Sequence, residues 1–378
     1  MAASPDLNMT VAKALSDMAS IQTVREKQRA FRQAALAIRG LETSLDTLAD
    51  ASGALPRIPH VGPSSLRIVQ EVLTHGHSPT VQRALAGSGQ ASGAEARDGL
   101  RRHFLSRAMA NHVLALTSYP ECRADFQTHS TWSDGSQTLE ALAAGCLARG
   151  YSHAAVTDHA GGLPIAGGLS EGRLRKQRLE IETVNRRFDG RFHLLQGVEA
   201  NIDADGNIDV DPAFRSSLDL ILAAPHSGLR STKWQTDRLV TAVRQPAVRI
   251  LAHPTGRKFD ARAGIAANWR TVFRAAADHG VAVEIDGDPS RQDCNFELIA
   301  MAVEEGCWIA LDSDAHAVDE LWYTDLARAH AALGGVPPER VINFWPLDRL
   351  MTWVRGDKTR AGKTRRAGAR APALPQRS

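Results

Sequence analysis

The stretch WIALDSDAH, residues 308–316, decides the fold. Its apolar part, 308–311, predicts a short buried strand, and Asp312, Asp314 and His316 follow it directly. The same pairing of an apolar run with an acid or an imidazole recurs at spacings of about 25–40 residues. The predicted strands are 124–128, 153–157, 193–198, 218–223, 248–252, 281–285 and 308–311.

Amphipathic helical stretches separate these seven strands, which is typical of repeated βα units in an α/β fold. In a barrel of parallel strands the carboxyl ends meet on one face, where such folds place active sites. One histidine at a strand end is usually structural, but five histidines with several acids at successive ends predict a metal site. Imidazole and carboxylate together suit Zn, Mn or Fe. The potential ligands and their neighbours at these ends are Gln127, His129, Asp158, His159, Glu199, His226, His253, Asp286, Asp288, Asp312, Asp314 and His316.

The composition is that of a globular protein, with 378 residues, 43% hydrophobic and 23% charged. No apolar run approaches the roughly 20 residues of a bilayer span, and the first residues lack the pattern of a signal peptide. We therefore expect a cytoplasmic protein without a membrane partner. The net charge of +3 combines an acidic middle, 121–355, with two basic ends.

The N-terminal region predicts helices. Apolar residues recur at helical spacing in 11–48, and 55–63 predicts a tight turn before a helix at 64–75. The stretch GSGQASG, 87–93, predicts a linker, and a helix at about 99–116 follows it. We therefore expect a helical domain (1–86), a linker with a connecting helix (87–120), an α/β domain (121–355) and a basic disordered tail (356–378).

Six ordered motifs resemble the PHP (polymerase and histidinol phosphatase) domain, most closely the one that ends bacterial X-family DNA polymerases. They are DFQTHSTWSDG (125–135), TDH (157–159), GVEANI (197–202), PHSG (225–228), AHPTGR (252–257) and SDAH (313–316). The resemblance covers about 124–354 and implies a distorted (β/α)7, TIM-like barrel with two or three divalent ions that hydrolyses phosphoesters. It implies three ligand sets: His129, Glu199 and Asp314; Glu199, His226 and His253; and Asp134, His159 and His316.

One position departs from the family pattern. The first motif of the family is H-x-H, and this chain has Gln127 at its first histidine. An amide oxygen is a poorer donor than imidazole to a borderline transition metal, so the first ion should bind more weakly or be absent. The other eight ligand positions are filled, which favours an enzyme over a decayed pocket kept as a binding platform.

The N-terminal region resembles the helix-hairpin-helix domain of the same polymerases, through KQRAFRQAALAI (27–38) and IPHVG (58–62). Such a hairpin grips a DNA phosphate with backbone N–H groups, here around Val61, Gly62 and Ser64. His60 replaces the first of two usual glycines, and its side chain may strain the turn. Only about 87–120 lies between the two resemblances, where the polymerases have a palm and a thumb, so polymerisation is excluded.

These features predict a metal-dependent phosphoesterase that acts on DNA by attack of a metal-activated hydroxide, as a 3′–5′ exonuclease, a 3′-phosphatase or an abasic-site nuclease of DNA repair. The expected catalytic residues are His129, Glu199, His226 and Asp314. Arg230, Arg257, Lys258 and Arg291 follow strand ends, and Arg257 with Arg230 are the expected phosphate-binding residues. A small-molecule phosphatase of the histidinol-phosphate type and a non-catalytic DNA-binding scaffold remain alternatives, and the oligomeric state is left open.

Overall fold

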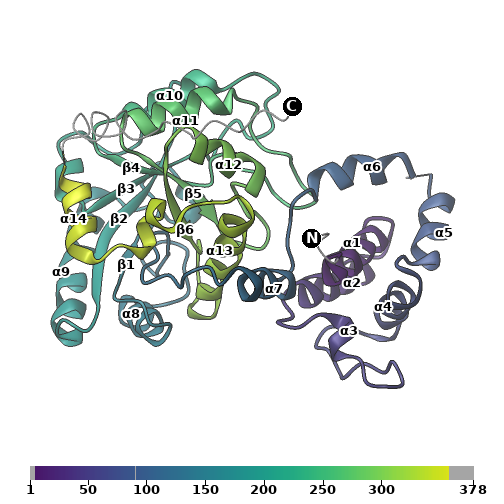
Figure 1. The fold of residues 1–378 in the computed structure, drawn as a ribbon. Helices are drawn as coiled ribbons and strands as arrows, with labels where there is room; N and C mark the ends of the chain where they lie inside the picture. The colour runs from purple at the N-terminus through teal and green to yellow at the C-terminus, as the bar shows by residue number, and fades with distance from the viewer. Residues whose placement is uncertain (1–4, 90, 357–378) are drawn as a thin grey trace, which may run out of the picture.

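The structure is a computed structural model that describes residues 5–89 and 91–356. It contains a group of N-terminal helices beside a larger α/β barrel (Figure 1). The expected basic tail, 356–378, lies outside the described residues apart from Gly356. In the described part of the chain, no helix combines the length and the apolar character that a membrane crossing requires.

Six parallel strands form one sheet in the order β1-β2-β3-β4-β5-β6. Nearly all of their residues are buried, as is typical of parallel sheets covered on both faces. Six of the seven predicted strands are therefore confirmed. Their bounds are β1 His153–Val156, β2 His193–Asn201, β3 Leu220–Ala224, β4 Val248–Leu251, β5 Ala282–Asp286 and β6 Trp308–Asp312.

The seventh predicted strand, 124–128, is wrong as a regular strand, although it occupies the seventh position of the barrel. It lies between β1 and β6, where Ala155 N donates to Asp125 O (2.9 Å) and Thr128 forms one parallel bridge with Ala315. Side chains replace the remaining ladder bonds, because Phe126 N donates to Asp312 Oδ1 (2.7 Å). The result is a distorted seven-staved α/β barrel.

Helices cover the outside of the sheet and close its lower end (Figure 1). The outer core joins the sheet to the surrounding helices, while a second apolar cluster inside the barrel includes Phe126, Leu222, Ile250 and Trp345. The predicted closing helix at 337–354 is present only in part, as two 3-10 turns followed by α14. The helices are α8 Leu139–Ala148, α9 Glu171–Phe188, α10 Thr236–Arg244, α11 Trp269–Asp278, α12 Phe296–Glu304, α13 Thr324–Leu333 and α14 Leu347–Arg355, with 3-10 turns at Pro164–Ala166, Arg215–Ser217, Val318–Tyr323, Pro338–Arg340 and Ile342–Phe344.

The N-terminal helices, which we call the helical unit (residues 7–87), have a core of their own. Val11 and Leu15 of α1 pack with Phe31 and Ile38 of α2 and with Val69 of α4. The periodic apolar residues in 11–48 correspond to the two long helices. The bounds are α1 Leu7–Ser20, α2 Arg25–Arg39, α3 Leu45–Leu48, α4 Pro63–His75 and α5 Pro79–Gly87.

The connection between the two parts is more ordered than the glycines of 87–93 suggest. Helix α6 (Ala91–Leu100) begins inside that stretch, and its Arg97 pairs with Asp17 of α1 at 3.1 Å. The helix expected at 99–116 is interrupted. It resumes as α7 (Arg107–Thr117), because the Ser106 hydroxyl caps its first turn by accepting from Met109 N.

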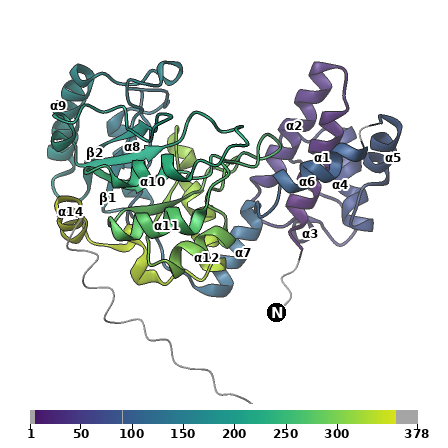
Figure 2. The same ribbon diagram turned by 90° about the horizontal axis from the view of Figure 1, so that it is seen from above.

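The helical unit touches the barrel through loops at the carboxyl ends of the strands (Figure 2). The buried Arg39 guanidinium of α2 lies 4.3 Å from the Phe259 ring centroid and donates to Pro289 O. Arg101 forms an ion pair with Asp260 and a second one, of 3.0 Å, with Asp17. The loops after β4 and β5 are therefore attached to α1, α2 and the residue that follows α6.

Candidate metal centre

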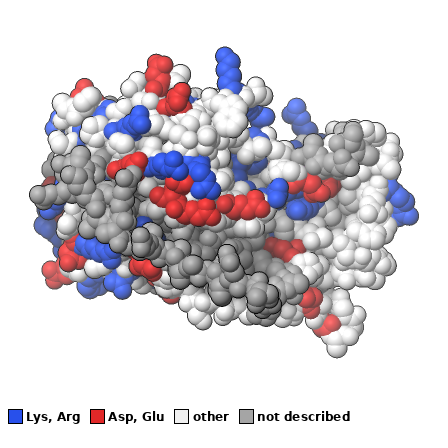
Figure 3. Space-filling model, turned by 45° about the horizontal axis from the view of Figure 1, so that its top comes forward, with Lys and Arg blue, Asp and Glu red and all other residues white. Residues whose placement is uncertain are grey.

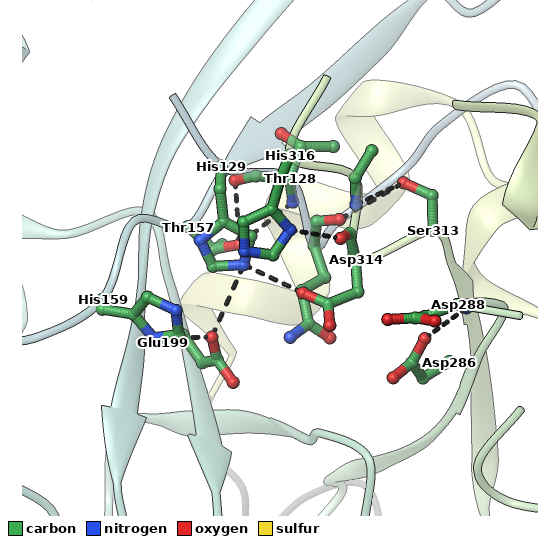
Figure 4. Close-up of polar contacts among 12 residues, drawn as sticks. Thr128, His129, Thr157, His159, Glu199, Asp286, Asp288, Ser313, Asp314 and His316 are labelled. Carbon is green, nitrogen blue, oxygen red and sulfur yellow. Dashed lines mark hydrogen bonds and ion pairs between the residues drawn. The ribbon is translucent and has the colours of Figure 1, made fainter. Parts of the chain in front are cut away.

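Nine residues were predicted as metal ligands, and the structure brings eight of them into one cluster at the carboxyl ends of the strands. Figure 4 shows five of them, His129, His159, Glu199, Asp314 and His316, turned toward a common space. Three overlapping groups have donor atoms within 4.8 Å of one another. They are His129, Asp134, His159 and His316; His159, Glu199 and His226; and His129, Glu199 and Asp314. The eighth member, His253, contacts Glu199. We call these eight residues the ligand cluster.

Glu199, inside β2, is the centre of the ligand cluster. Its Oε1 lies 3.0 Å from His226 Nε2 and 2.6 Å from His253 Nε2, and its Oε2 lies 3.0 Å from His159 Nδ1. Burial alone would raise the pKa of Glu199, but the charges of His159 and His226 outweigh burial and hold this pKa well below its usual range. Glu199 is therefore an ionised carboxylate in the position of a bridging ligand.

Asp134 forms the outer side of the cluster. Its two carboxylate oxygens lie 3.6 Å from His159 Nε2 and 3.6 Å from His316 Nε2. Although burial opposes protonation, the Glu199 charge and the Asp134 contact raise the pKa of His159 to about 10. Contacts with Asp134 and Asp314 raise the pKa of His316 to about 9 in the same way. The acids thus make these imidazoles attract a proton or another cation strongly.

The donor set fits divalent transition-metal ions. Several buried donor atoms, among them His129 Nδ1, His159 Nδ1 and Glu199 Oε2, approach each other without making hydrogen bonds of proper geometry. Buried polar atoms are normally satisfied, so their convergence without hydrogen bonds is what a set of ligands around ions produces. Imidazoles with carboxylates are the donors that Zn, Mn and Fe prefer.

Gln127 lies two residues before His129 on the irregular seventh segment. Its side chain is fully buried, and neither Oε1 nor Nε2 has a hydrogen-bond partner. A buried amide without a partner carries a penalty of about 1–3 kcal/mol. The residue is therefore available to a further ligand, although it belongs to none of the three donor groups.

Supporting residues that sequence reasoning did not assign a role hold the ligands in place. Asp158, a strand-end residue, accepts from Ser130 N (2.8 Å) and from Gln177 Nε2 (2.6 Å), so its carboxylate is occupied in fixing the loop before Asp134. Asn201 Oδ1 contacts His226 Nδ1 at 2.5 Å and orients that ring. Asn201 could have been found only through its place in the motif GVEANI.

The two expected phosphate-binding arginines are not in the cluster. Arg257 is buried, with its guanidinium 3.9 Å from the Phe104 ring centroid and Nε donating to Arg291 O (2.9 Å). Arg230 is exposed on the loop after β3. Arg291, which was the weaker expectation, reaches the site, because its Nη1 lies 3.3 Å from Asp314 Oδ2 and 3.9 Å from Asp286 Oδ2.

The hairpin residues Val61, Gly62 and Ser64 lie where α4 begins, far along the chain from the ligand cluster. Gly62 precedes the helix and no side chain caps its first turn. A pocket of about 390 Å³ opens here between α1, α2 and α4, and Lys27, His60, Gly62, Ser64 and Arg67 are among its lining residues. His60 has a φ of +64°, a backbone conformation that favours glycine, which is why a glycine is usual at this position.

Comparisons with known proteins give a consistent result for the barrel. No family model matches the chain. The DNA polymerase/3′-5′ exonuclease PolX of Bacillus subtilis is 32% identical over 243 residues, 64% of this chain, and the match spans only 42% of that relative. A probable phosphatase of Edwardsiella ictaluri is 29% identical over 59% of this chain and 90% of its own length.

A solved structure and a third relative add to this comparison. The histidinol phosphate phosphatase of Lactococcus lactis, solved with zinc, L-histidinol and phosphate, has a TM-score of 0.41 and 16% identity over 56% of this chain and 93% of its own. The probable phosphatase YcdX of Escherichia coli is 32% identical over 171 residues, which are 43% of this chain and 67% of that protein. The chain therefore belongs to the PHP family of metal-dependent phosphoesterases.

Proposed function

We propose that this protein hydrolyses phosphoester bonds of DNA at the ligand cluster. The observation that carries the hydrolytic part is the ionised Glu199, buried among the imidazoles of His159, His226 and His253. A buried carboxylate that faces several imidazoles without proper hydrogen bonds is a preformed cation site. Phosphoester hydrolysis needs such a site, because negative charge develops on the phosphoryl oxygens.

The residues of this chain divide the work. The eight members of the ligand cluster would hold two or three divalent ions, which supply an acidified water and neutralise charge on phosphoryl oxygens. His129, Glu199, His226 and Asp314 stand closest to the reacting atoms in this proposal. Asp158 and Asn201 fix the orientation of Asp134 and His226. Arg291 offers a permanent positive charge beside Asp314 for a non-bridging oxygen of the substrate.

The choice of DNA rests on the helical unit. Its uncapped α4 start, with Lys27 and Arg67 in the adjoining pocket, suits a nucleic-acid phosphate. Arg39 of the same unit is in contact with the loop that carries Arg291. A strand held at Val61, Gly62 and Ser64 could therefore extend toward the ligand cluster. The 3′–5′ exonuclease named for the Bacillus subtilis relative supports this substrate.

A small-molecule phosphatase is the second candidate. It is favoured by the probable phosphatase of Edwardsiella ictaluri, of which the matched region covers 90%. In that case the helical unit only packs against the loops after β4 and β5, and a phosphate monoester is the substrate.

The deciding experiment offers both substrates to the full chain with added Mn²⁺. We expect stepwise shortening of single-stranded DNA labelled at its 5′ end, and loss of this activity in His226→Ala. His193→Ala is the matched control, because His193 is an exposed histidine at the opposite end of β2. Hydrolysis of p-nitrophenyl phosphate without DNA cleavage would favour the small-molecule phosphatase. No hydrolysis of either substrate, with no metal bound, would favour a non-catalytic scaffold.

A further inference from the structure

The loops after β3, β4 and β5 carry four cations that lie outside the ligand cluster. Arg230 and Lys233 are exposed on the loop after β3, Arg262 belongs to the loop after β4, and Arg291 to the loop after β5. These loops follow strands whose ends carry His226, His253 and Asp286. The cations therefore stand beside the site on consecutive loops.

Three of these cations are close enough to influence one another. Burial lowers the pKa of Arg262 first, and the nearby charges of Arg291 and Arg230 lower it further. Arg262 is held in this position because its Nε donates to Gly256 O. Like charges repel, so their convergence costs stability unless a polyanion joins them. By contrast, the face of the barrel in Figure 3 shows acidic and basic side chains mixed, so the surface as a whole is not basic.

An exposed tryptophan stands on the first of these loops. Trp234 is 71% exposed and is the one aromatic side chain among the large exposed apolar residues of the described chain. Its loop is fixed at both ends, because Gln235 N donates to Ala266 O (2.8 Å) and Arg238 Nη1 donates to Ser227 O (2.8 Å). Leu229 packs against Gly256, which places the same loop beside the turn after His253. The indole is thus displayed on a supported loop.

We propose that Arg230, Lys233, Trp234 and Arg262 form a binding rim for the single-stranded end of the nucleic-acid substrate. The arginines and the lysine would bind successive phosphates, and a base would stack on the indole of Trp234. This rim deepens the function proposed above and rests on it. Its loop after β4 also carries Phe259 and Asp260, which contact Arg39 and Arg101. The rim therefore continues toward the helical unit, as expected for one strand held by both.

A binding measurement with the full chain tests this rim separately from hydrolysis. The probe is a fluorescent, phosphorothioate-linked oligo-dT of about 12 nucleotides, a length within the usual site sizes for single strands. Stacking of one base is worth about 1–3 kcal/mol, so Trp234→Ala should weaken binding about tenfold or more. Trp234→Phe should restore most of the affinity. Leu179→Ala is the control, because Leu179 is 64% exposed on α9 and should not matter.

The salt dependence of the same binding tests the cations. Each phosphate contact on a single strand contributes about 0.7 to the slope of log K against log salt, so Arg230→Ala should flatten the slope by about this amount. Hydrolysis of p-nitrophenyl phosphate should stay unchanged in Trp234→Ala and Arg230→Ala.

Three results would contradict the rim. Wild-type affinity in Trp234→Ala, with DNA still cleaved, would overturn the rim and leave the proposed function standing. An equal loss of oligo-dT binding and p-nitrophenyl phosphate hydrolysis would mean a structural effect and overturn it too. No binding or cleavage of DNA by the wild-type chain would remove the DNA function together with the rim.

Discussion

Two glutamates inside the barrel, Glu199 in β2 and Glu284 in β5, are both fully buried and yet have opposite pKa shifts. Imidazoles surround Glu199 and hold its pKa well below the usual range, although burial opposes this. Glu284 has its pKa raised well above that range by burial and by the neighbouring charges of Asp312 and Asp286. The neighbours, and not burial itself, therefore decide which side of the barrel is a cation site.

The strongest test of this difference exchanges each acid for its amide. Glu199→Gln removes the charge that unites the ligand cluster, so we expect metal content to fall and hydrolysis to drop at least about a thousandfold, more than supporting residues usually cost. Glu284→Gln mimics a carboxyl that is already protonated, and both properties should change little. Metal analysis and the rate on p-nitrophenyl phosphate measure the two effects. Similar losses in both variants would refute the distinction.

Arg291 is the cation that stands between the two regions. Its Nη1 lies near both Asp314 and Asp286, so Arg291→Met would leave buried carboxylates uncompensated. We expect a loss of about 3 kcal/mol in the free energy of unfolding of metal-free protein, measured by urea denaturation. Added Mn²⁺ should restore part of this stability, because it supplies the missing positive charge.

The same variant has a simple control. Arg230→Met changes an exposed arginine and should leave the unfolding free energy within about 0.5 kcal/mol of the wild type. If Arg291→Met is as stable as Arg230→Met without metal, the two carboxylates do not depend on this charge.

Histidines repeat the comparison in the opposite sense. His330 and His153 are buried away from the ligand cluster, and burial, as the main cause, lowers their pKa values to about 3 and about 4. The unfolded chain, with a histidine pKa near 6.5, takes up protons first as the solution is acidified. Stability should therefore be complete above about pH 6.5 and fall toward pH 4, by up to about 1.4 kcal/mol per pH unit for each histidine.

His153→Gln tests that slope. The variant removes one titrating group and should make the loss of stability between pH 6.5 and 4 shallower, as measured by denaturation at a series of pH values. An unchanged slope would mean that His153 takes up a proton as readily when folded as when unfolded.

The smallest expected effect is at Gln127. Gln127→His restores an imidazole at a buried position whose amide has no partner. Metal retention or turnover should rise, by less than about tenfold, because the eight residues of the ligand cluster are already present. Dialysis against a chelator followed by metal analysis measures this change. No change in either property would show that this position does not limit the site.

The sequence predicted the barrel and its ligands well because both depend on local patterns. Each strand of four to nine residues is followed by its own ligand, so His159, His226 and His253 could be located one at a time. The irregular segment 124–128 was beyond such reasoning. Its backbone bonds go partly to side chains such as Asp312, which is 184 residues or more away along the chain.

The arginines show the same limit. Arg257 and Arg291 both follow strand ends, and the nearness of Arg257 to His253 made it the better prediction. The structure turns Arg257 onto Phe104, a residue of the connection between the two parts, and brings Arg291 to Asp314. No local pattern indicates which of two arginines an aromatic ring will cover.

The sequence by itself determined the fold class, the metal-binding chemistry and the order of the ligands, because strand periodicity and the residue that follows each strand are local properties. The tertiary structure decided which acids ionise, which arginine faces the site and which loops contact the helical unit. These depend on distances between residues far apart in the chain, and electrostatic energies and packing are set by those distances alone.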